Sequence, residues 1–171
     1  MPELAIQFMR GNPGVITDAI RRALPLSPDL GGFDKTPAHC RILDRGSQRV
    51  IEAVIGGVQQ VCRDDSGLLC TAFLACDYRH YDAAIDFAFR QVGKPYDFYA
   101  LVLDMVWLAC GRSRYIHLRD NDRVRWDCSR LCEAAAWRAG RRYRLGFDAP
   151  AMPVTLLEEL MADPCVRVVW K

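Results

Sequence analysis

The sequence predicts an α+β fold, and three observations support this class. Short β-like apolar runs follow one another between residues 38 and 76, and turns containing Gly or Asp separate them. From residue 81 onward the apolar residues recur at helical spacing instead. The 171 residues are 51% hydrophobic, which suits one domain with a full core. We therefore expect a single domain over residues 1–171, in which helices pack against an antiparallel sheet.

The first half of the chain is expected to hold one short helix and a β-meander. The helix is "GVITDAIRRAL", residues 14–24, which ends before Pro25 and is followed by a turn-rich loop. Four strands are then predicted, at residues 38–43, 49–54, 57–62 and 68–76. Their close spacing favours antiparallel pairing between consecutive strands.

The second half is expected to be mainly helical. Residues 81–92 are amphipathic and stop at Gly93. The segment "DFYALVLDMVWLACG", residues 97–111, is apolar on most faces but too short to cross a bilayer, so we expect a buried helix. After a polar connector over 112–126, we expect helices over 128–139 and 153–161 and a strand over 165–170.

The charge balance argues against a nucleic-acid partner. The formal net charge is +2, close to zero. One basic cluster consists of Arg138, Arg141, Arg142 and Arg144. We interpret it as a solvated helix end whose cations complement the helix dipole, with an anion-binding surface as the alternative.

No transmembrane segment is expected, and the oligomeric state stays open.

The eight cysteines are interpreted as reduced thiols. The first twenty residues lack a basic start followed by an apolar core and a cleavage site, so we expect a cytoplasmic protein. Such a protein would reach a substrate outside the cell only through lysis, injection or a secretion system. No C-x-x-C pair is present, so neither a metal site nor a cofactor is expected.

Cys128 has a special position within "RWDCSRLCEAAAWRAG", residues 125–140. Asp127 is a suitable N-cap, and Gly140 suits the left-handed residue that ends a helix. Cys128 therefore falls in the first helical turn, where free N–H groups and the helix dipole favour a thiolate. The alternative is a small buried hydrophobic residue.

A catalytic thiol needs a base, and the three histidines, His39, His80 and His117, all precede Cys128. His39 begins a predicted strand, so its rigid placement makes it the best candidate. His80 sits at a turn before a helix, and His117 sits in the charged connector. The alternative for His39 is a strand-end histidine that is simply hydrogen-bonded in place.

Glu52 is the candidate for the residue that orients the histidine. It lies in "VIEAV" on the next predicted strand, between apolar residues. A buried carboxylate needs a partner, and a histidine on the neighbouring strand would provide one. The alternative is an outward-facing strand residue. Asp34 and Asp44 are weaker candidates, because turn-like surroundings explain them.

The stretches "GKPYDFYAL" and "WDCSRLCEAAAWRAG" resemble the G-x-P-Y … D-C-S-x-L … G pattern of NlpC-type papain-like cysteine hydrolases. In most of that superfamily the histidine follows the cysteine helix. Here "TPAHCRIL" and "VIEAV" precede it, and this order resembles the circularly permuted branch. That branch contains the YaeF/YiiX-like proteins and their lecithin:retinol acyltransferase relatives. The resemblance extends over nearly the whole chain.

The resemblance implies a permuted papain-like fold with Cys128 as nucleophile, His39 as general base and Glu52 as the third polar residue. Such a thiol hydrolase would cleave an amide bond in peptidoglycan stem peptides or another peptide. A lipid-directed acyltransferase or thioesterase, or an inactive binding or assembly module, are the alternatives. In a catalytic pair the pKa of Cys128 should fall below about 8.5 and that of His39 should rise.

The residues expected to bind substrate are Tyr96, Asp127, Ser129 and Arg130. Two departures from the family pattern bear on substrate specificity. His39 stands between Ala38 and Cys40, whereas family members have Ser-His before an apolar strand. Arg130 stands where many relatives have Gly or Glu, so it would favour an acidic substrate group or point to solvent.

Overall fold

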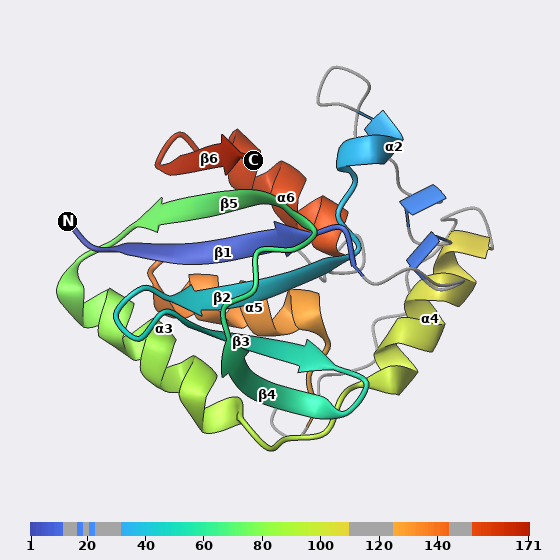
Figure 1. The fold of residues 1–171 in the computed structure, drawn as a ribbon, viewed down its shortest axis with the longest axis horizontal. Helices are drawn as coiled ribbons and strands as arrows, with labels where there is room; N and C mark the ends of the chain where they lie inside the picture. Colours follow the sequence, from blue (N-terminus) through green and yellow to red (C-terminus); the bar gives the residue numbers. More distant parts are fainter. Residues whose placement is uncertain (12–16, 19–20, 23–31, 110–124, 144–151) are drawn as a thin grey trace.

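The computed structural model describes residues 1–11, 17–18, 21–22, 32–109, 125–143 and 152–171 (Figure 1). The strands are β1 (Glu3–Met9), β2 (His39–Asp44), β3 (Arg49–Val54), β4 (Gly57–Cys62), β5 (Leu68–Ala75) and β6 (Val166–Trp170). The helices are α2 (Gly32–Lys35), α3 (Tyr78–Gln91), α4 (Phe98–Ala109), α5 (Cys128–Arg138) and α6 (Pro153–Ala162). All strands join one antiparallel sheet, so the predicted α+β class is confirmed.

The largest difference from the sequence-based expectation is β1, which was not predicted and lies inside the sheet. The strand order is β4-β3-β2-β1-β5-β6. The predicted meander is therefore correct for β2, β3 and β4 but wrong for β5, which pairs with β1 and β6. Every residue of β1 after Glu3 is buried, so the strand lacks the exposed alternation that marks a half-buried strand.

One face of the sheet carries the main core. Ile6 and Phe8 of β1 and Ile42 of β2 are completely buried there, and α3, α5 and α6 pack against them. Helix α5 lies behind β2 and β3 in Figure 1. Its packing residues include Ala135 and Ala136, whose small side chains permit a close approach to the sheet. The helix start is thereby held beside the first residues of β2.

The opposite face of the sheet is more polar. Arg41 of β2 is buried there, and its Nε donates to Gln7 Oε1 of β1 at 2.8 Å. Its guanidinium also donates to the backbone oxygen of Asp64 and approaches Asp65, both in the turn between β4 and β5. This buried cation therefore ties β1, β2 and the β4–β5 turn together.

Helix α4 occupies the predicted position but is not the buried helix expected from its composition. Phe98, Tyr99, Val102 and Val106 are all exposed by 42% or more. The helix lies at the side of the molecule, beyond the ends of β3 and β4 (Figure 1). An apolar composition shows that a helix has apolar faces, but which of them is covered depends on neighbouring elements.

Several predicted features lie wholly or partly outside the described residues. Of the helix expected over 14–24, residues 17, 18, 21 and 22 are described, and these are helical. His117, Arg144 and most of the predicted connector lie outside. No helix in the described parts of the chain is long and apolar enough to cross a membrane.

The central position of β1 predicts a large cost for truncating its core side chains. Ile6→Ala should lower the free energy of unfolding by about 2–5 kcal/mol, because Ile6 is completely buried. Ile55→Ala is the matched control, since Ile55 is 75% exposed in the β3–β4 turn, and it should cost less than about 0.5 kcal/mol. Urea unfolding followed by circular dichroism measures both. Equal small losses would contradict the buried position of Ile6.

Candidate active site

Cys128 occupies the first turn of α5, as predicted. The Asp127 side chain caps the helix by accepting a hydrogen bond from the Arg130 N–H at 2.9 Å. At the other end, Gly140 has φ +83° and its N–H donates to the Trp137 carbonyl. Cys128 is 7% exposed and lies beside the free N–H groups of the helix start.

The structure brings Cys128, His39 and Glu52 together. His39 is the first residue of β2 and Glu52 lies on the adjacent antiparallel strand β3. His39 Nε2 is 2.8 Å from Glu52 Oε2, and the imidazole also interacts electrostatically with the Cys128 thiol. Gln59 of β4 donates to the second Glu52 oxygen at 3.1 Å, which fixes the carboxylate. The imidazole therefore bridges a thiol and a carboxylate.

The electrostatic environment favours a charged His39–Glu52 pair. Burial lowers the pKa of His39, but hydrogen bonds with Cys128 and Glu52 outweigh this and raise it to about 9. The hydrogen bond from His39 lowers the pKa of Glu52, and Gln59 and Arg41 act in the same direction. Glu52 is thus held ionised, where it stabilises the imidazolium.

The pKa of Cys128 differs from the expectation. Its hydrogen bond with Cys40 and its burial raise the pKa of Cys128 well above the ordinary value, although His39 lowers it. The predicted fall below about 8.5 is therefore wrong for the resting site. That expectation included the helix start and His39 but not a second thiol on the facing strand. Because the raised pKa values of both groups favour a protonated Cys128 thiol and a protonated His39 ring, the pair has to lose one proton before the thiol can be activated.

A cleft of about 900 Å³ lies over these residues. His39, Glu52 and Cys128 line it, together with three of the four predicted substrate-binding residues, Tyr96, Asp127 and Ser129. Arg130 is not among the lining residues described. Its guanidinium instead approaches two carboxylates, with Nε 3.3 Å from Asp127 Oδ2 and Nη1 3.9 Å from Asp97 Oδ2. Burial raises the pKa of Asp127 to about 6, although Arg130 lowers it.

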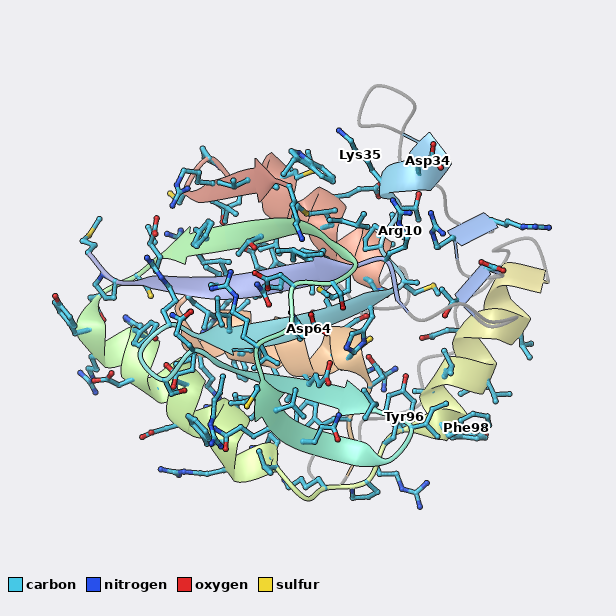
Figure 2. All side chains as sticks on the ribbon, viewed as in Figure 1. Arg10, Asp34, Lys35, Asp64, Tyr96 and Phe98 are labelled. Atoms are coloured by element: carbon cyan, nitrogen blue, oxygen red, sulfur yellow. The ribbon has the colours of Figure 1, made fainter. Side chains whose placement is uncertain are left out.

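Tyr96 is placed by the loop that connects α3 to α4. This loop runs beside the start of α5, because Trp126 N–H donates to the Pro95 carbonyl and Asp97 N–H donates to the Trp126 carbonyl. Figure 2 shows Tyr96 between the sheet and the start of α4. Burial raises the pKa of Tyr96, and Cys128 and Asp127 act in the same direction, so its hydroxyl stays neutral.

The β3–β4 turn holds the other side of this loop. Gly57 has φ +112°, and a Cβ at this position would lie 2.7 Å from the Lys94 carbonyl oxygen. The same carbonyl accepts a hydrogen bond from the Val58 N–H at 2.8 Å. A side chain at Gly57 would therefore push the loop away from the sheet.

Two residues that position the site were not singled out from the sequence. Trp126 is 8% exposed, and its ring N–H donates to Gln91 Oε1 at 3.0 Å while its ring packs edge-on against Phe87. Arg41 follows His39 by two residues, so it lies on the same face of β2 near Glu52. Two sequence features could have indicated these residues: Arg41 is a cation inside an apolar strand, and Trp126 comes directly before the cysteine helix.

Of the other two histidines, only His80 lies in the described part of the chain, and it does not line the cleft. His80 lies in the first turn of α3, half exposed, with Nδ1 3.0 Å from Asp77 Oδ1. His117 lies outside the described residues.

No family model matches this sequence, and no curated protein is significantly similar to it.

The His39–Glu52 pair predicts a pH-dependent contribution to stability. Glu52→Gln should lower the free energy of unfolding by about 1.5–3 kcal/mol near pH 6. A raised His39 pKa contributes stability that is complete below its ordinary value of 6.5 and lost as pH rises through about 9. A lowered Glu52 pKa contributes stability above 4.5 that is lost as pH falls further. The difference in unfolding free energy between wild type and Glu52→Gln should thus be largest between pH 4.5 and pH 6.5.

Urea unfolding at about pH 6 and about pH 10 checks this expectation, with Glu159→Gln on the exposed surface of α6 as the matched control. The control should change stability little at either pH. A Glu52→Gln cost that is equal at both pH values would contradict the ion pair.

Proposed function

We propose that this protein is a thiol hydrolase of permuted papain-like architecture that cleaves an amide bond. The observation that carries the proposal is the position of His39, which contacts both the Cys128 thiol and the Glu52 carboxylate. Such a nucleophile, base and orienting residue form the arrangement needed for acyl transfer. The resemblance of the sequence to the permuted NlpC-type branch supports the same assignment.

In the proposed reaction the Cys128–His39 pair has first released one proton to solvent, and the Cys128 sulfur then attacks the substrate carbonyl while the remaining proton ends on His39. Glu52 stabilises the imidazolium that forms, and N–H groups at the start of α5 stabilise the oxyanion. His39 then gives the proton to the leaving amine, so the C–N bond breaks and a thioester remains on Cys128. Water, activated by His39, hydrolyses the thioester and restores the thiol.

The lining of the cleft supports a peptide substrate, such as a peptidoglycan stem peptide. Arg41, Glu52 and Gln59 line it from the sheet, and Asp104 and Tyr96 line it from the side of α4. These groups can hydrogen-bond the polar backbone of a peptide. The volume falls within the range typical of small-ligand and peptide sites.

A lipid-directed acyltransferase or thioesterase is the second candidate, and one observation favours it. Helix α4 exposes Phe98, Tyr99, Val102 and Val106, and its Leu101 lines the cleft. Figure 2 shows Phe98 on the outer side of α4. An apolar surface next to the cleft would suit an acyl chain, and the same Cys128–His39 chemistry cleaves esters.

The proposal predicts selective acylation of Cys128. With p-nitrophenyl acetate, wild type should release nitrophenol in a burst and carry an acetyl group on Cys128, as shown by peptide mapping. Cys128→Ala should remove the burst, and His39→Ala should slow it by about 100-fold or more, because the general base is lost. Cys165→Ser is the control, since Cys165 is an exposed thiol that does not line the cleft, and it should react like wild type.

Two substrates then decide the bond that is cleaved. Peptidoglycan fragments should yield new amino groups, whereas phosphatidylcholine vesicles would yield free fatty acid if the lipid candidate holds. Acetylation confined to the exposed Cys62 and Cys165, with Cys128 unmodified, would overturn both and favour an inactive binding or assembly module.

The neighbours of Cys128 predict opposite shifts in its reactivity with pH. His39→Ala should move iodoacetamide alkylation of Cys128 to higher pH, because His39 lowers the pKa of this thiol. Glu52→Gln should act more weakly in the same direction. Cys40→Ala should move alkylation to lower pH, because the hydrogen bond with Cys40 raises the pKa of Cys128. Peptide mapping after timed alkylation across a pH series measures each shift, and identical profiles in all variants would contradict the coupling.

A further inference from the structure

A cluster of buried thiols meets beneath the cleft. Cys40, the second residue of β2, is completely buried, and its Sγ lies 4.0 Å from Ser129 Oγ. Cys128 Sγ lies 3.8 Å from the same hydroxyl, and the two thiols influence each other's pKa. Cys132, one turn further along α5, also contacts Cys40. The proposed hydrolysis uses Cys128 alone, so it gives no role to the other two thiols.

The geometry distinguishes Cys40 from Cys132 as a disulfide partner of Cys128. Residues i and i+4 of a helix have Cβ atoms roughly 5–6 Å apart, whereas a disulfide needs about 3.5–4.5 Å. Cys128 and Cys132 have this helical spacing. Cys40 instead approaches from the facing strand β2, with both sulfurs within 4.0 Å of the Ser129 hydroxyl, so no helical spacing fixes the separation of these two thiols.

Access to the two thiols is also unequal. Cys128 lines the cleft and is 7% exposed, whereas Cys40 is sealed in the core. A small polar oxidant that enters the cleft therefore meets Cys128 first, beside the His39 ring. Cys40 lies on the buried side of Cys128. A thiol in this position can act as a resolving cysteine, which attacks a sulfenic acid on its neighbour to form a disulfide.

We propose that Cys40 and Cys128 form a reversible disulfide when a hydroperoxide enters the cleft, and that this bond switches the nucleophile off. The bond itself is independent of the hydrolase assignment, while the loss of activity rests on the proposed function.

The chemistry proceeds in two balanced steps. The Cys128 sulfur attacks the hydroperoxide, the O–O bond breaks, and the thiol proton leaves with the alkoxide as an alcohol. The product is a Cys128 sulfenic acid. The Cys40 sulfur then attacks the Cys128 sulfur, the S–O bond breaks, and hydroxide leaves with the Cys40 proton as water. Two thiols have lost two electrons in total, and a dithiol reductant reverses the change by exchange.

The test is peptide mapping of the full chain after treatment with hydrogen peroxide and quenching with N-ethylmaleimide. Wild type should yield a peptide pair linked through Cys40 and Cys128, and dithiothreitol should release both thiols. Cys132→Ala is the matched control and should form the same link. Cys40→Ala should lose the link and accumulate sulfinic acid on Cys128, because no thiol remains to trap the sulfenic acid. Cys40→Ser, closer in size, repeats this measurement if the Ala variant fails to fold.

Two results would overturn the switch. One is sulfinic acid on Cys128 of wild type without a disulfide, and the other is a Cys128–Cys132 link. Acylation by p-nitrophenyl acetate, measured on the same samples, separates this proposal from the proposed function. An oxidised protein should lose acylation and regain it with dithiothreitol. A disulfide in a protein that never acylates supports the bond and overturns the hydrolase, whereas acylation without any disulfide overturns the switch alone.

Discussion

The packing of α5 against β2 is the constraint on which the rest of the site depends. Small residues such as Ala135 and Ala136 let the helix lie close to the sheet, and they are completely buried in that contact. The helix start then meets the first residue of β2, so the Cys128 thiol reaches the His39 ring. A local helix cap alone would leave Cys128 without a base. Only the contact between helix and strand gives the cysteine at the helix start the histidine partner that the proposed reaction needs.

The same contact has a second consequence for the thiol. Strand β2 presents Cys40 to α5 immediately after His39, so Cys40 lies beside Ser129 and interacts with the proposed nucleophile, Cys128. Its hydrogen bond raises the pKa of Cys128 and opposes the effect of His39. The resemblance to the permuted hydrolases would place Ser before His39 and an apolar strand after it. Cys40 is therefore a feature of this chain that links its proposed reactivity to its redox chemistry.

The polar face of the sheet supports the other half of the site. Glu52 receives Gln59 from β4 and faces His39, while Arg41 helps to keep it ionised. Arg41 in turn needs Gln7 and the β4–β5 turn to compensate its burial. The orienting carboxylate is thus held by a network that spans β1 to β4. Local strand order alone would not fix its geometry.

Local features of the sequence determined a substantial part of this structure. Asp127 and Gly140 set the ends of α5, and the short turns after β2 and β3 set the β2–β4 meander, because caps and tight turns act within a few residues. Cys128, His39 and Glu52 could also be chosen from the sequence, because their positions at a helix start, at a strand start and on the next strand are local features. The tertiary structure alone decided that β1 enters between β2 and β5, that α4 exposes apolar side chains, and that Cys40 raises the pKa of Cys128. Strand neighbours, helix coverage and burial depend on residues that are distant along the chain. Local periodicity does not predict which distant segment packs against a given strand or helix.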